Sequence, residues 1–567
     1  MRNSDGRRRA AGSTFARMTP TLRRRRRPLA MALVIAAAAP TAGAQRPDLA
    51  AVTDKVFAAW NSTHTPGCAV GIAQGGRELL TRGYGMADLA GSRPLLPGTI
   101  LESGSVAKQF TAAAVMLLVN DGKLRLDDDA RTVLPELPVY GRTITFRNLL
   151  THTSGLREWS NLVAWQGWPC GTRVHTQSDV FELITHQQML NYPVGDYYSY
   201  TNSGFLLLRT VVERVSGMPF AQFTAQRIFT PLGMSNTSWR DDFTRVVPGL
   251  AQAYSRKADG FHLDMPNDNV IAAGGLLTTV GDWLLWNDHL TKKTLGTGVV
   301  DSLTRRMKLT RGLEIAYALG LTVNSYRGLR EISHSGSTAG YGTYLARYPE
   351  QNDLSIAVMC NVSSAGATGL THAIVDAMVP GLPRAAAPDT VTTGAAAVAK
   401  LAGIYRDTRT NTVMRLDTSR GQLRRDGGAA FLPLRDGGYQ LGASRVRFTT
   451  TASGQPMSLR VPTSDGDTVV HAFMAAERWK PTTSELASIA GRYRNEEIGT
   501  TFAVAAAGDR LTVSPRVGVV DTLSATYRDA FVNGDETVWF VRDKQGRVTA
   551  MHFGSGRAWD FVSARVK

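Results

Sequence analysis

The chain has 567 residues, of which 43% are hydrophobic and 20% are charged. This length predicts about three or four domains, and the composition excludes a largely disordered chain, a collagen, a coiled coil and a multi-pass membrane protein. The formal net charge of +17 is concentrated at the start, because residues 1–44 contain ten arginines and one acid, Asp5. Without that segment the charge is about +8 with no dense basic stretch, so we expect no nucleic-acid binding.

Residues 1–44 have the pattern of a secretory signal peptide. Arg23–Arg27 form a cationic region, Leu29–Ala39 an apolar region, and Ala42-Gly43-Ala44 a small-residue cleavage site before Gln45. The apolar run is shorter than the ~20 residues that span a bilayer, and no cysteine follows for a lipid anchor. A disordered basic tail is the alternative. We expect an exported protein, periplasmic or secreted, without a transmembrane anchor once the signal is removed.

Residues 45–382 are predicted to form one α+β domain. A β-hairpin is predicted over 66–84 with its turn at Gly75-Gly76, and a buried helix over Val106–Val119. Helical patterns broken by proline and glycine fill 130–310. Short strands and a last helix are predicted at Leu319–Val323, Leu329–His334, Gly342–Tyr348, Leu354–Cys360 and Thr368–Met378. Because strands at both ends enclose the helices, pieces distant in sequence should share one sheet.

The C-terminal part contains a repeat. An Ala/Pro/Thr-rich linker is predicted at 383–398, and the sequence LAGIYR at Leu401–Arg406 recurs as IAGRYR at Ile489–Arg494, 88 residues later. Each repeat, 399–480 and 481–567, has room for about seven or eight short strands. We therefore predict two small all-β, barrel-like repeats, which could close as one barrel or as two.

The three cysteines, Cys68, Cys170 and Cys360, are far apart and include no C-x-x-C pair. So few cysteines exclude a disulfide-rich scaffold. At most one disulfide could form, and the interpretation that we favour is three thiols in the core.

A serine and a lysine stand three residues apart at the start of the predicted buried helix, as Ser105-Val106-Ala107-Lys108. This spacing puts both side chains on one face, one turn apart. A serine hydroxyl needs a base to become a nucleophile, and a desolvated lysine can be neutral and act as one. Free N–H groups at the helix start would favour an anion formed there. The alternative is a helix-capping serine with a solvated lysine.

A second polar motif, Tyr200-Thr201-Asn202, follows a Pro/Gly-rich turn and precedes a predicted helix. A phenol ionises near pH 10, so a tyrosinate at neutral pH would need an adjacent cation such as Lys108. The alternative is a polar turn with structural tyrosines.

A third motif, His334-Ser335-Gly336, ends a predicted strand. An edge strand with a small glycine lets a substrate lie against its backbone. The next N–H group, on Ser337, could pair with that of Ser105 to form an oxyanion hole. A structural histidine is the alternative.

The order S-x-x-K, Y-x-N, H-x-G resembles the serine hydrolase family of class C β-lactamases, D,D-peptidases (penicillin-binding proteins), D-aminopeptidases and related esterases. Flanking segments agree, namely Leu149–Leu156 (LLTHTSGL), Pro231–Met234 (PLGM) and Ala272–Leu276 (AAGGL). The resemblance covers about residues 50–380. It implies an α+β, β-lactamase/transpeptidase-like domain, with an antiparallel sheet flanked by helices and a helical insert. The two repeats that follow are similar to lipocalin-like modules attached to some members.

The resemblance also implies roles for the candidate residues. The nucleophile would be Ser105, and the base and proton-shuttle roles would be shared by its two catalytic partners. The catalytic residues are Ser105, Lys108 and Tyr200, and the substrate-binding or oxyanion residues are Asn202, His334, Gly336 and Ser337. No metal and no cofactor are implied, and the expected partner is a small-molecule or peptide substrate. The oligomeric state is left open.

One departure bears on the substrate. β-Lactamases of this family usually carry Lys-Thr-Gly where this chain has His334-Ser335-Gly336, and neutral imidazole is a weaker anion site than an ammonium group. H-x-G is instead similar to D-aminopeptidases and many general hydrolases of the family. Our first hypothesis is therefore an exported serine hydrolase that cuts amides of D-amino acids or peptidoglycan-derived peptides. The alternatives are an esterase on small acyl esters, a β-lactamase and, from another class, a non-catalytic penicillin- or ligand-binding protein.

Overall fold

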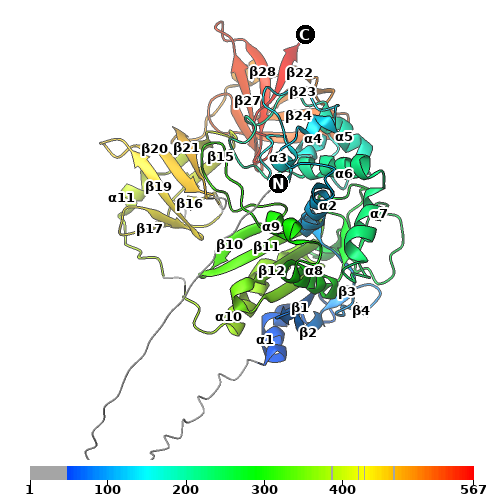
Figure 1. Ribbon diagram of the computed structural model, residues 1–567. Coiled ribbons are helices and arrows are strands. Elements are labelled where there is room, and N and C mark those ends of the chain that lie inside the picture. Colours follow the sequence, from blue (N-terminus) through cyan, green and yellow to red (C-terminus); the bar gives the residue numbers. More distant parts are fainter. Residues whose placement is uncertain (1–47, 385–386, 419–420, 427, 464–465) are drawn as a thin grey trace, which may run out of the picture. The chain divides into compact units, whose positions relative to one another are not determined.

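The computed structural model describes residues 48–384, 387–418, 421–426, 428–463 and 466–567, and Figure 1 labels many of their helices and strands. The predicted signal segment, 1–44, lies outside the described residues. The first part of the described chain is built on a six-stranded sheet with the order β10-β11-β12-β13-β1-β2, antiparallel throughout. Its strands are β1 (Cys68–Gln74), β2 (Arg77–Tyr84), β10 (Thr322–Tyr326), β11 (Leu329–Thr338), β12 (Tyr341–Tyr348) and β13 (Leu354–Cys360).

Both ends of this domain contribute to the sheet. β1 pairs with β2 across the predicted turn, where Gly75 and Gly76 have φ of +60° and +75°. Positive φ at both turn positions favours glycine. On its other side β1 pairs with β13, with Val70 opposite Val358. The predicted hairpin and the predicted union of distant strands are both confirmed.

Most helices of this domain lie, in sequence, between the two ends of the sheet. The predicted buried helix is confirmed as α2, which begins at Lys108 and buries Phe110 and Leu118 completely. A 3₁₀ turn at Gly104–Ala107 precedes it and contains Ser105. The helices of this part are α1 (Leu49–Val56), α2 (Lys108–Asn120), α3 (Phe146–Leu150), α4 (Trp159–Trp165), α5 (Gln177–Thr185), α6 (Asn202–Ser216), α7 (Phe220–Thr224), α8 (Val280–Lys292), α9 (Thr297–Leu303) and α10 (Ala367–Met378). Its short strands are β3 (Met86–Asp88), β4 (Arg93–Pro94), β5 (Leu101–Glu102), β6 (Ser238–Trp239), β7 (Tyr254–Lys257), β8 (Gly260–Leu263) and β9 (Leu276–Thr278).

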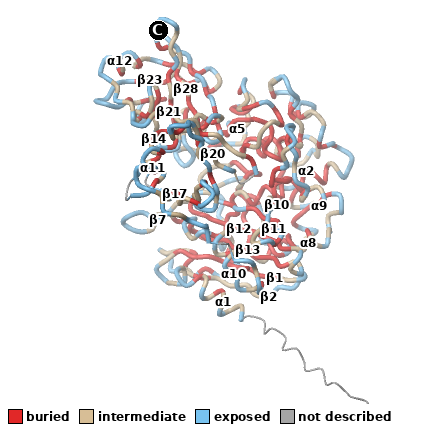
Figure 2. The backbone as a smooth tube through the Cα atoms, turned by 90° about the vertical axis from the view of Figure 1, so that its left-hand side faces the viewer, coloured by how far each residue is buried: buried red, intermediate tan, exposed pale blue. Residues whose placement is uncertain are grey.

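Both faces of the sheet are covered, and β1 points small side chains to one face and branched side chains to the other. Gly71 faces α8, where a Cβ would lie 3.1 Å from a Leu284 side-chain carbon. Val70 and Ile72 point to the opposite face and share a buried cluster with Ile374 of α10. Every residue of β13, in the middle of the sheet, is buried (Figure 2). The sheet is therefore the rigid support of the domain.

Two stretches differ from the sequence prediction. The strand predicted over Leu319–Val323 begins at Thr322 instead. Gly320 has a φ of +70°, and a Cβ on it would lie 2.6 Å from the carbonyl oxygen of Lys108, so the chain turns tightly against α2 before the strand starts. Within the predicted linker, 383–398, the end is helical, because α11 spans Ala395–Ala399.

The expectation of three core thiols is wrong. Cys68 and Cys360 are direct partners on β1 and β13 and form a disulfide, with their Cα atoms 4.0 Å apart. Cys170 is exposed. The bonded cysteines are 292 residues apart, and only the pairing of two distant strands makes them neighbours, so their spacing carries no signal.

The two repeats form two separate β structures. In the first, eight strands follow the order β16-β15-β14-β21-β20-β19-β18-β17, and its two ends meet where the Phe431 N–H donates to the Leu423 carbonyl at 2.8 Å. The second is a closed barrel of β22 to β29. The strands of the first are β14 (Gly403–Asp407), β15 (Val413–Asp417), β16 (Arg424–Arg425), β17 (Phe431–Pro433), β18 (Tyr439–Leu441), β19 (Ser444–Thr450), β20 (Pro456–Pro462) and β21 (Thr468–Ala475). The strands of the second are β22 (Gly491–Asn495), β23 (Thr500–Ala507), β24 (Arg510–Arg516), β25 (Val519–Ala525), β26 (Ala530–Asn533), β27 (Glu536–Arg542), β28 (Val548–Gly554) and β29 (Phe561–Val566).

The sequence repeat marks the same corner in both structures. Tyr405 and Tyr493 are fully buried, and each hydroxyl donates to a carbonyl four residues earlier, at 2.8 Å to Leu401 and 2.5 Å to Ile489. A short helix precedes each corner, α11 in the first repeat and α12 (Thr483–Ile489) in the second. The repeated tyrosine therefore fastens the entry of the chain into each barrel.

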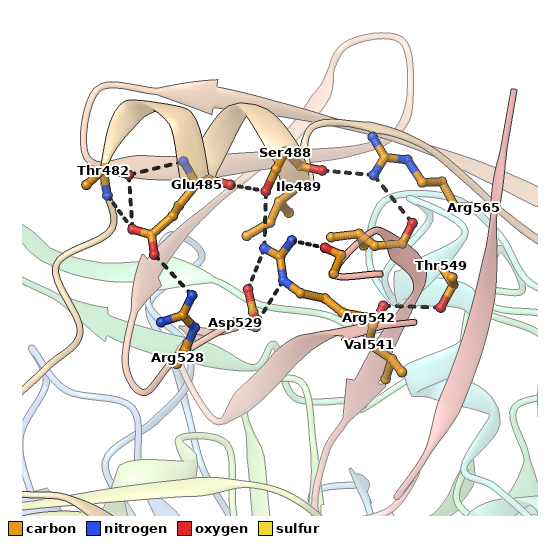
Figure 3. A network of polar contacts seen from close by, with 12 residues as sticks. Thr482, Glu485, Ser488, Ile489, Arg528, Asp529, Val541, Arg542, Thr549 and Arg565 are labelled. Carbon is orange, nitrogen blue, oxygen red and sulfur yellow. Dashed lines mark hydrogen bonds and ion pairs between the residues drawn. The ribbon is translucent and has the colours of Figure 1, made fainter. Parts of the chain in front are cut away.

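Polar contacts hold α12 against the second barrel (Figure 3). Thr482 and Glu485 form a capping box at the start of the helix. Arg542 donates to both carboxylate oxygens of Asp529, at 2.9 and 2.8 Å, and to the hydroxyl of Ser488 on the helix at 3.1 Å. This forked contact ties the helix to two strand ends of the barrel.

Candidate active site

Ser105 lies where a turn and a strand approach each other very closely. Gly104 has a φ of +51°, and a Cβ there would lie 2.5 Å from the backbone nitrogen of Ser337. On β11, a Cβ on Gly336 would lie 2.0 Å from the carbonyl oxygen of Ser103. Both positions therefore need glycine. The approach brings the backbones of Ser105 and Ser337 to one pocket, where their N–H groups were predicted to hold an oxyanion.

Lys108 is directed at Ser105 from one turn further along the chain. Its Nζ lies 3.1 Å from Oγ of Ser105, 2.7 Å from Oδ1 of Asn202 and 2.7 Å from the carbonyl oxygen of Ala273. The last two oxygens can only accept hydrogen bonds, so they occupy both N–H groups of a neutral amine. The nitrogen lone pair then faces the Ser105 hydroxyl, as a general base requires.

Burial changes the proton affinities of Lys108 and Tyr200 in opposite directions. It lowers the pKa of Lys108 to about 7, although the Glu158 carboxylate raises it in part. It raises the pKa of the Tyr200 phenol above its usual value, although the Ser105 hydroxyl lowers it in part. Near neutral pH a large fraction of Lys108 is therefore an amine while Tyr200 stays a phenol. This favours the lysine as the base and the tyrosine as a proton donor.

Tyr200 is held close to both residues. Its ring centre is 4.9 Å from Nζ of Lys108, and its buried hydroxyl faces Ser105 without a hydrogen bond of ordinary geometry among the described residues. His152, in the LLTHTSGL segment, packs its ring 4.2 Å from that of Tyr200 and accepts a hydrogen bond from the Thr201 N–H at 3.2 Å. The LLTHTSGL segment therefore holds the loop that contains Tyr200 in place through His152.

Sequence reasoning missed a buried carboxylate, Glu158. It is fully buried and accepts hydrogen bonds from Nδ2 of Asn202 at 2.9 Å and from the Thr201 hydroxyl at 3.0 Å. With Oδ1 toward Lys108 and Nδ2 toward Glu158, the Asn202 amide has one orientation and keeps one N–H for a substrate. A lone glutamate after a loop has no spacing signal that would have marked it.

His334 lies behind the reacting groups. Its Nδ1 is 2.6 Å from the Ser335 carbonyl oxygen and its Nε2 is 3.0 Å from the Tyr317 hydroxyl. A carbonyl only accepts, so Nδ1 carries the proton and Nε2 accepts from the phenol. Burial and the Lys108 charge lower the pKa of His334 to about 3, so the ring is neutral. Both ring nitrogens are engaged within the protein, and the ring does not line the pocket beside Ser105.

A pocket of about 110 Å³ adjoins Ser105. The residues that line it include Ser105, Trp159, Asn202, Arg240, Asp268 and Ser337. The Arg240 guanidinium is neutralised there by Glu102 at 2.8 Å and Asp268 at 3.5 Å. The pocket is therefore polar, with Trp159 as its aromatic wall.

The second barrel also lies against the site. Arg557, between β28 and β29, has its guanidinium carbon 4.9 Å from the centre of the Tyr200 ring. Arg157, next to Glu158, forms an ion pair with Glu497 of the barrel at 2.6 Å. These partners are hundreds of residues apart in the chain, so only the tertiary structure joins them.

Two kinds of feature are not found in the described residues. No group of three or more histidine, cysteine, aspartate or glutamate side chains there could hold a metal ion. Among the helices of the same residues, none is long and apolar enough to cross a membrane.

Known proteins resemble this chain in its sequence. The family model Beta-lactamase matches residues 52–378. A D-aminopeptidase of Cereibacter sphaeroides is 26% identical over 549 residues, which cover 92% of this chain and 99% of the relative. Penicillin-binding protein 4* of Bacillus subtilis is 28% identical over 307 residues, which cover 49% of this chain and 64% of that protein.

Solved structures share the fold. The octameric penicillin-binding protein homologue from Pyrococcus abyssi has a TM-score of 0.51 at 19% identity, over 83% of this chain and 98% of that chain. A penicillin-binding protein from Bacillus halodurans has a TM-score of 0.50 at 25% identity, over 58% and 99%. The matched family model spans more than half of the chain and includes Ser105, Lys108 and Tyr200. The chain is thus a serine hydrolase, and it belongs to the beta-lactamase family, as its motifs predicted.

Proposed function

We propose that the chain is an exported enzyme that works through an acyl-enzyme on Ser105 and hydrolyses amide bonds in peptides that contain D-amino acids, including fragments of peptidoglycan. The environment of Lys108 is the observation that best supports this mechanism. Lys108 is buried, its pKa is lowered to about 7, and its Nζ lies 3.1 Å from the Ser105 hydroxyl. The D-aminopeptidase that aligns with 92% of this chain supports an amide of a D-residue as the substrate.

The reaction follows from the positions of the protons. Neutral Lys108 takes the Ser105 proton as Oγ attacks the amide carbon, and the N–H groups of Ser105 and Ser337 stabilise the oxyanion. Tyr200 donates its proton to the departing amine nitrogen and regains one from the Lys108 ammonium. The products of this acylation step are a free amine and an ester on Ser105. Water then attacks the ester, with Lys108 and Tyr200 returning the proton by the reverse route.

Export is supported by two independent features. The sequence begins with the predicted signal segment at 1–44. The Cys68–Cys360 disulfide is a bond that persists in oxidising compartments and is rare in the cytosol. Amino-terminal sequencing of the protein recovered from the periplasm or medium of expressing cells would find Gln45 first. Recovery of the uncleaved chain in the cytosol would refute export.

The acyl-enzyme is tested by intact mass after incubation with a penicillin, beside Ser105→Ala as the control. An adduct on the wild type alone identifies Ser105 as the nucleophile with slow deacylation, as in a D,D-peptidase. Loss of the drug without an adduct indicates a β-lactamase.

If the drug is left intact, the next substrates to assay are D-alanine p-nitroanilide, its L isomer and p-nitrophenyl acetate. Ser105-dependent release from the D-anilide supports the proposal, and release from the ester alone indicates an esterase.

A further inference from the structure

The tyrosine loop, the segment 193–201 that contains the proton donor, is held inside the catalytic domain by its backbone. The Ser199 N–H donates to the carbonyl oxygen of His152 at 3.0 Å. Nε of Arg311, in the chain before β10, donates to the carbonyl oxygen of Asp196 at 3.0 Å. The backbone of the loop is therefore fixed in both of its halves.

Between these two anchors, the Tyr197 side chain reaches the first of the two C-terminal barrels. Its ring centre lies 4.8 Å from the guanidinium carbon of Arg311 and 4.6 Å from that of Arg409. Both are cation–π contacts. Arg409 lies in the turn between β14 and β15 of the first barrel. The first barrel therefore contacts the chain only three residues before Tyr200.

A carboxylate of the same barrel joins the two arginines. Asp467, directly before β21, forms an ion pair with Arg311 and another with Arg409, the second at 2.8 Å. The Asp467 side chain is only 9% exposed, so solvent screens these charges less than it screens a surface pair. Nη2 of Arg409 also donates to the carbonyl oxygen of Thr468 at 2.8 Å. The barrel thus fixes the guanidinium that contacts Tyr197.

The position of the Tyr200 hydroxyl depends on its loop. The hydroxyl is buried and has no hydrogen bond of ordinary geometry among the described residues, so no polar partner holds it in place there. Under the proposed function, on which this inference rests, this hydroxyl protonates the departing amine. A general acid must lie within hydrogen-bond reach of the atom that it protonates, and a displacement of about 1 Å can cost about 100-fold in rate.

We propose that the first barrel holds Tyr200 in position for proton donation, through the contact of Arg409 with Tyr197. Arg409 is a positioning residue, because it acts through Tyr197 and not on the substrate. Its effect should depend on the bond that is cleaved. An amide nitrogen needs a proton in order to leave, whereas p-nitrophenolate leaves as a stable anion. Displacement of Tyr200 should therefore slow the first reaction and spare the second.

The test compares D-alanine p-nitroanilide with the p-nitrophenyl ester of D-alanine, which form the same acyl-enzyme. The ratio kcat/KM covers the steps up to that acyl-enzyme, so it reports the departure of the leaving group. Arg409→Gln should lower kcat/KM about 10- to 100-fold on the anilide and change it little on the ester. Tyr200→Phe should show the same selectivity with a larger loss, and Arg409→Lys should keep part of the rate on the anilide.

Two further variants separate positioning from damage to the fold. Arg415→Gln is the matched control, because Arg415 belongs to the same barrel and pairs with Asp426 of that barrel at 3.4 Å. It should leave both rates unchanged. Tyr197→Leu removes the ring from the other side of the contact and should reproduce the selectivity of Arg409→Gln. Equal losses on the two substrates, or an unchanged rate on the anilide, would overturn the proposal.

Failure of the proposed function would look different. If the wild type cleaves the p-nitrophenyl ester but not the anilide, the amide proposal fails, and the ethyl ester of D-alanine replaces the anilide, because ethoxide also needs a proton to leave. A loss in Arg409→Gln that is confined to the ethyl ester would still support the positioning role, and equal losses would refute it. Hydrogen exchange of residues 193–203 needs no substrate. It should be faster in Arg409→Gln than in the wild type and Arg415→Gln, and equal exchange would overturn the proposal.

Discussion

Oδ1 of Asn202 lies 2.7 Å from Nζ of Lys108, while Nδ2 of the same amide lies 2.9 Å from the Glu158 carboxylate. The Asn202 amide therefore bridges Lys108 and the buried Glu158 carboxylate, and the two charged groups form no direct ion pair. This keeps Lys108 fixed beside Ser105 and lets burial dominate its pKa, which is lowered to about 7. The predictions below depend on that arrangement.

Activity should depend on pH through Lys108. Below its pKa of about 7 the lysine is protonated and cannot accept the Ser105 proton, so kcat/KM should fall about tenfold per pH unit. Above it, kcat/KM should level off. Arg557 lowers the pKa of Lys108, so Arg557→Gln should move the acid limb to higher pH. Arg516→Gln should not, because the Arg516 guanidinium lies over the Trp168 ring at 3.6 Å and does not act on Lys108. A profile that is flat from pH 5 to 9 would contradict the assignment of the base.

Lys108→Met should abolish turnover and stabilise the fold, more at low pH than at high pH. The native pKa, about 7, lies below that of an unfolded lysine, so the cost of burying the charge is full below pH 7 and shrinks as the pH rises toward 10. The gain in unfolding free energy over the wild type should be about 2 to 3 kcal/mol larger at pH 6 than at pH 9. Urea unfolding at both pH values measures it. Lys292→Met, on the exposed end of α8, should show no such difference.

Gly336→Ala should damage the oxyanion site. The added Cβ would lie 2.0 Å from the Ser103 carbonyl and 2.4 Å from the Thr343 hydroxyl, so β11 must move away from the turn that contains Ser105. We expect kcat to fall by about 100-fold or more, the usual effect of losing an oxyanion donor. Ser335→Ala, at an exposed side chain on the same strand, should leave kcat within about twofold. Equal rates for the two variants would contradict the proposed oxyanion hole.

Removing the disulfide should destabilise the chain. Cys68 and Cys360 close a loop of 292 residues, which restricts the unfolded state strongly, so Cys68→Ala/Cys360→Ala should lose about 3 to 5 kcal/mol. A reducing agent should lower the Tm of the wild type to that of the double variant. Cys170→Ser, at an exposed free thiol, should change neither value. A wild-type Tm that is insensitive to reduction would show that the bond does not contribute.

Local patterns carried most of what the sequence predicted correctly. The turn at Gly75-Gly76, the buried helix α2 and the repeated segments Leu401–Arg406 and Ile489–Arg494 all depend on residues within a few positions of one another. The Ser105–Lys108 pair belongs to the same class, because a spacing of three fixes their separation on one turn. Such features need no knowledge of which distant segments meet.

The tertiary structure alone decided the surroundings of those residues. Strand pairing joins Cys68 to Cys360, folding of the insert buries Glu158 against Asn202, and docking of the second barrel places Arg557 over Tyr200. In each case the partners are far apart in the chain and carry no shared periodicity. The sequence by itself determined the family and predicted the nucleophile and its base, because the motifs that carry them are short. The fold decided the proton affinities of Lys108 and Tyr200, because they depend on burial and on charges that only long-range packing brings together.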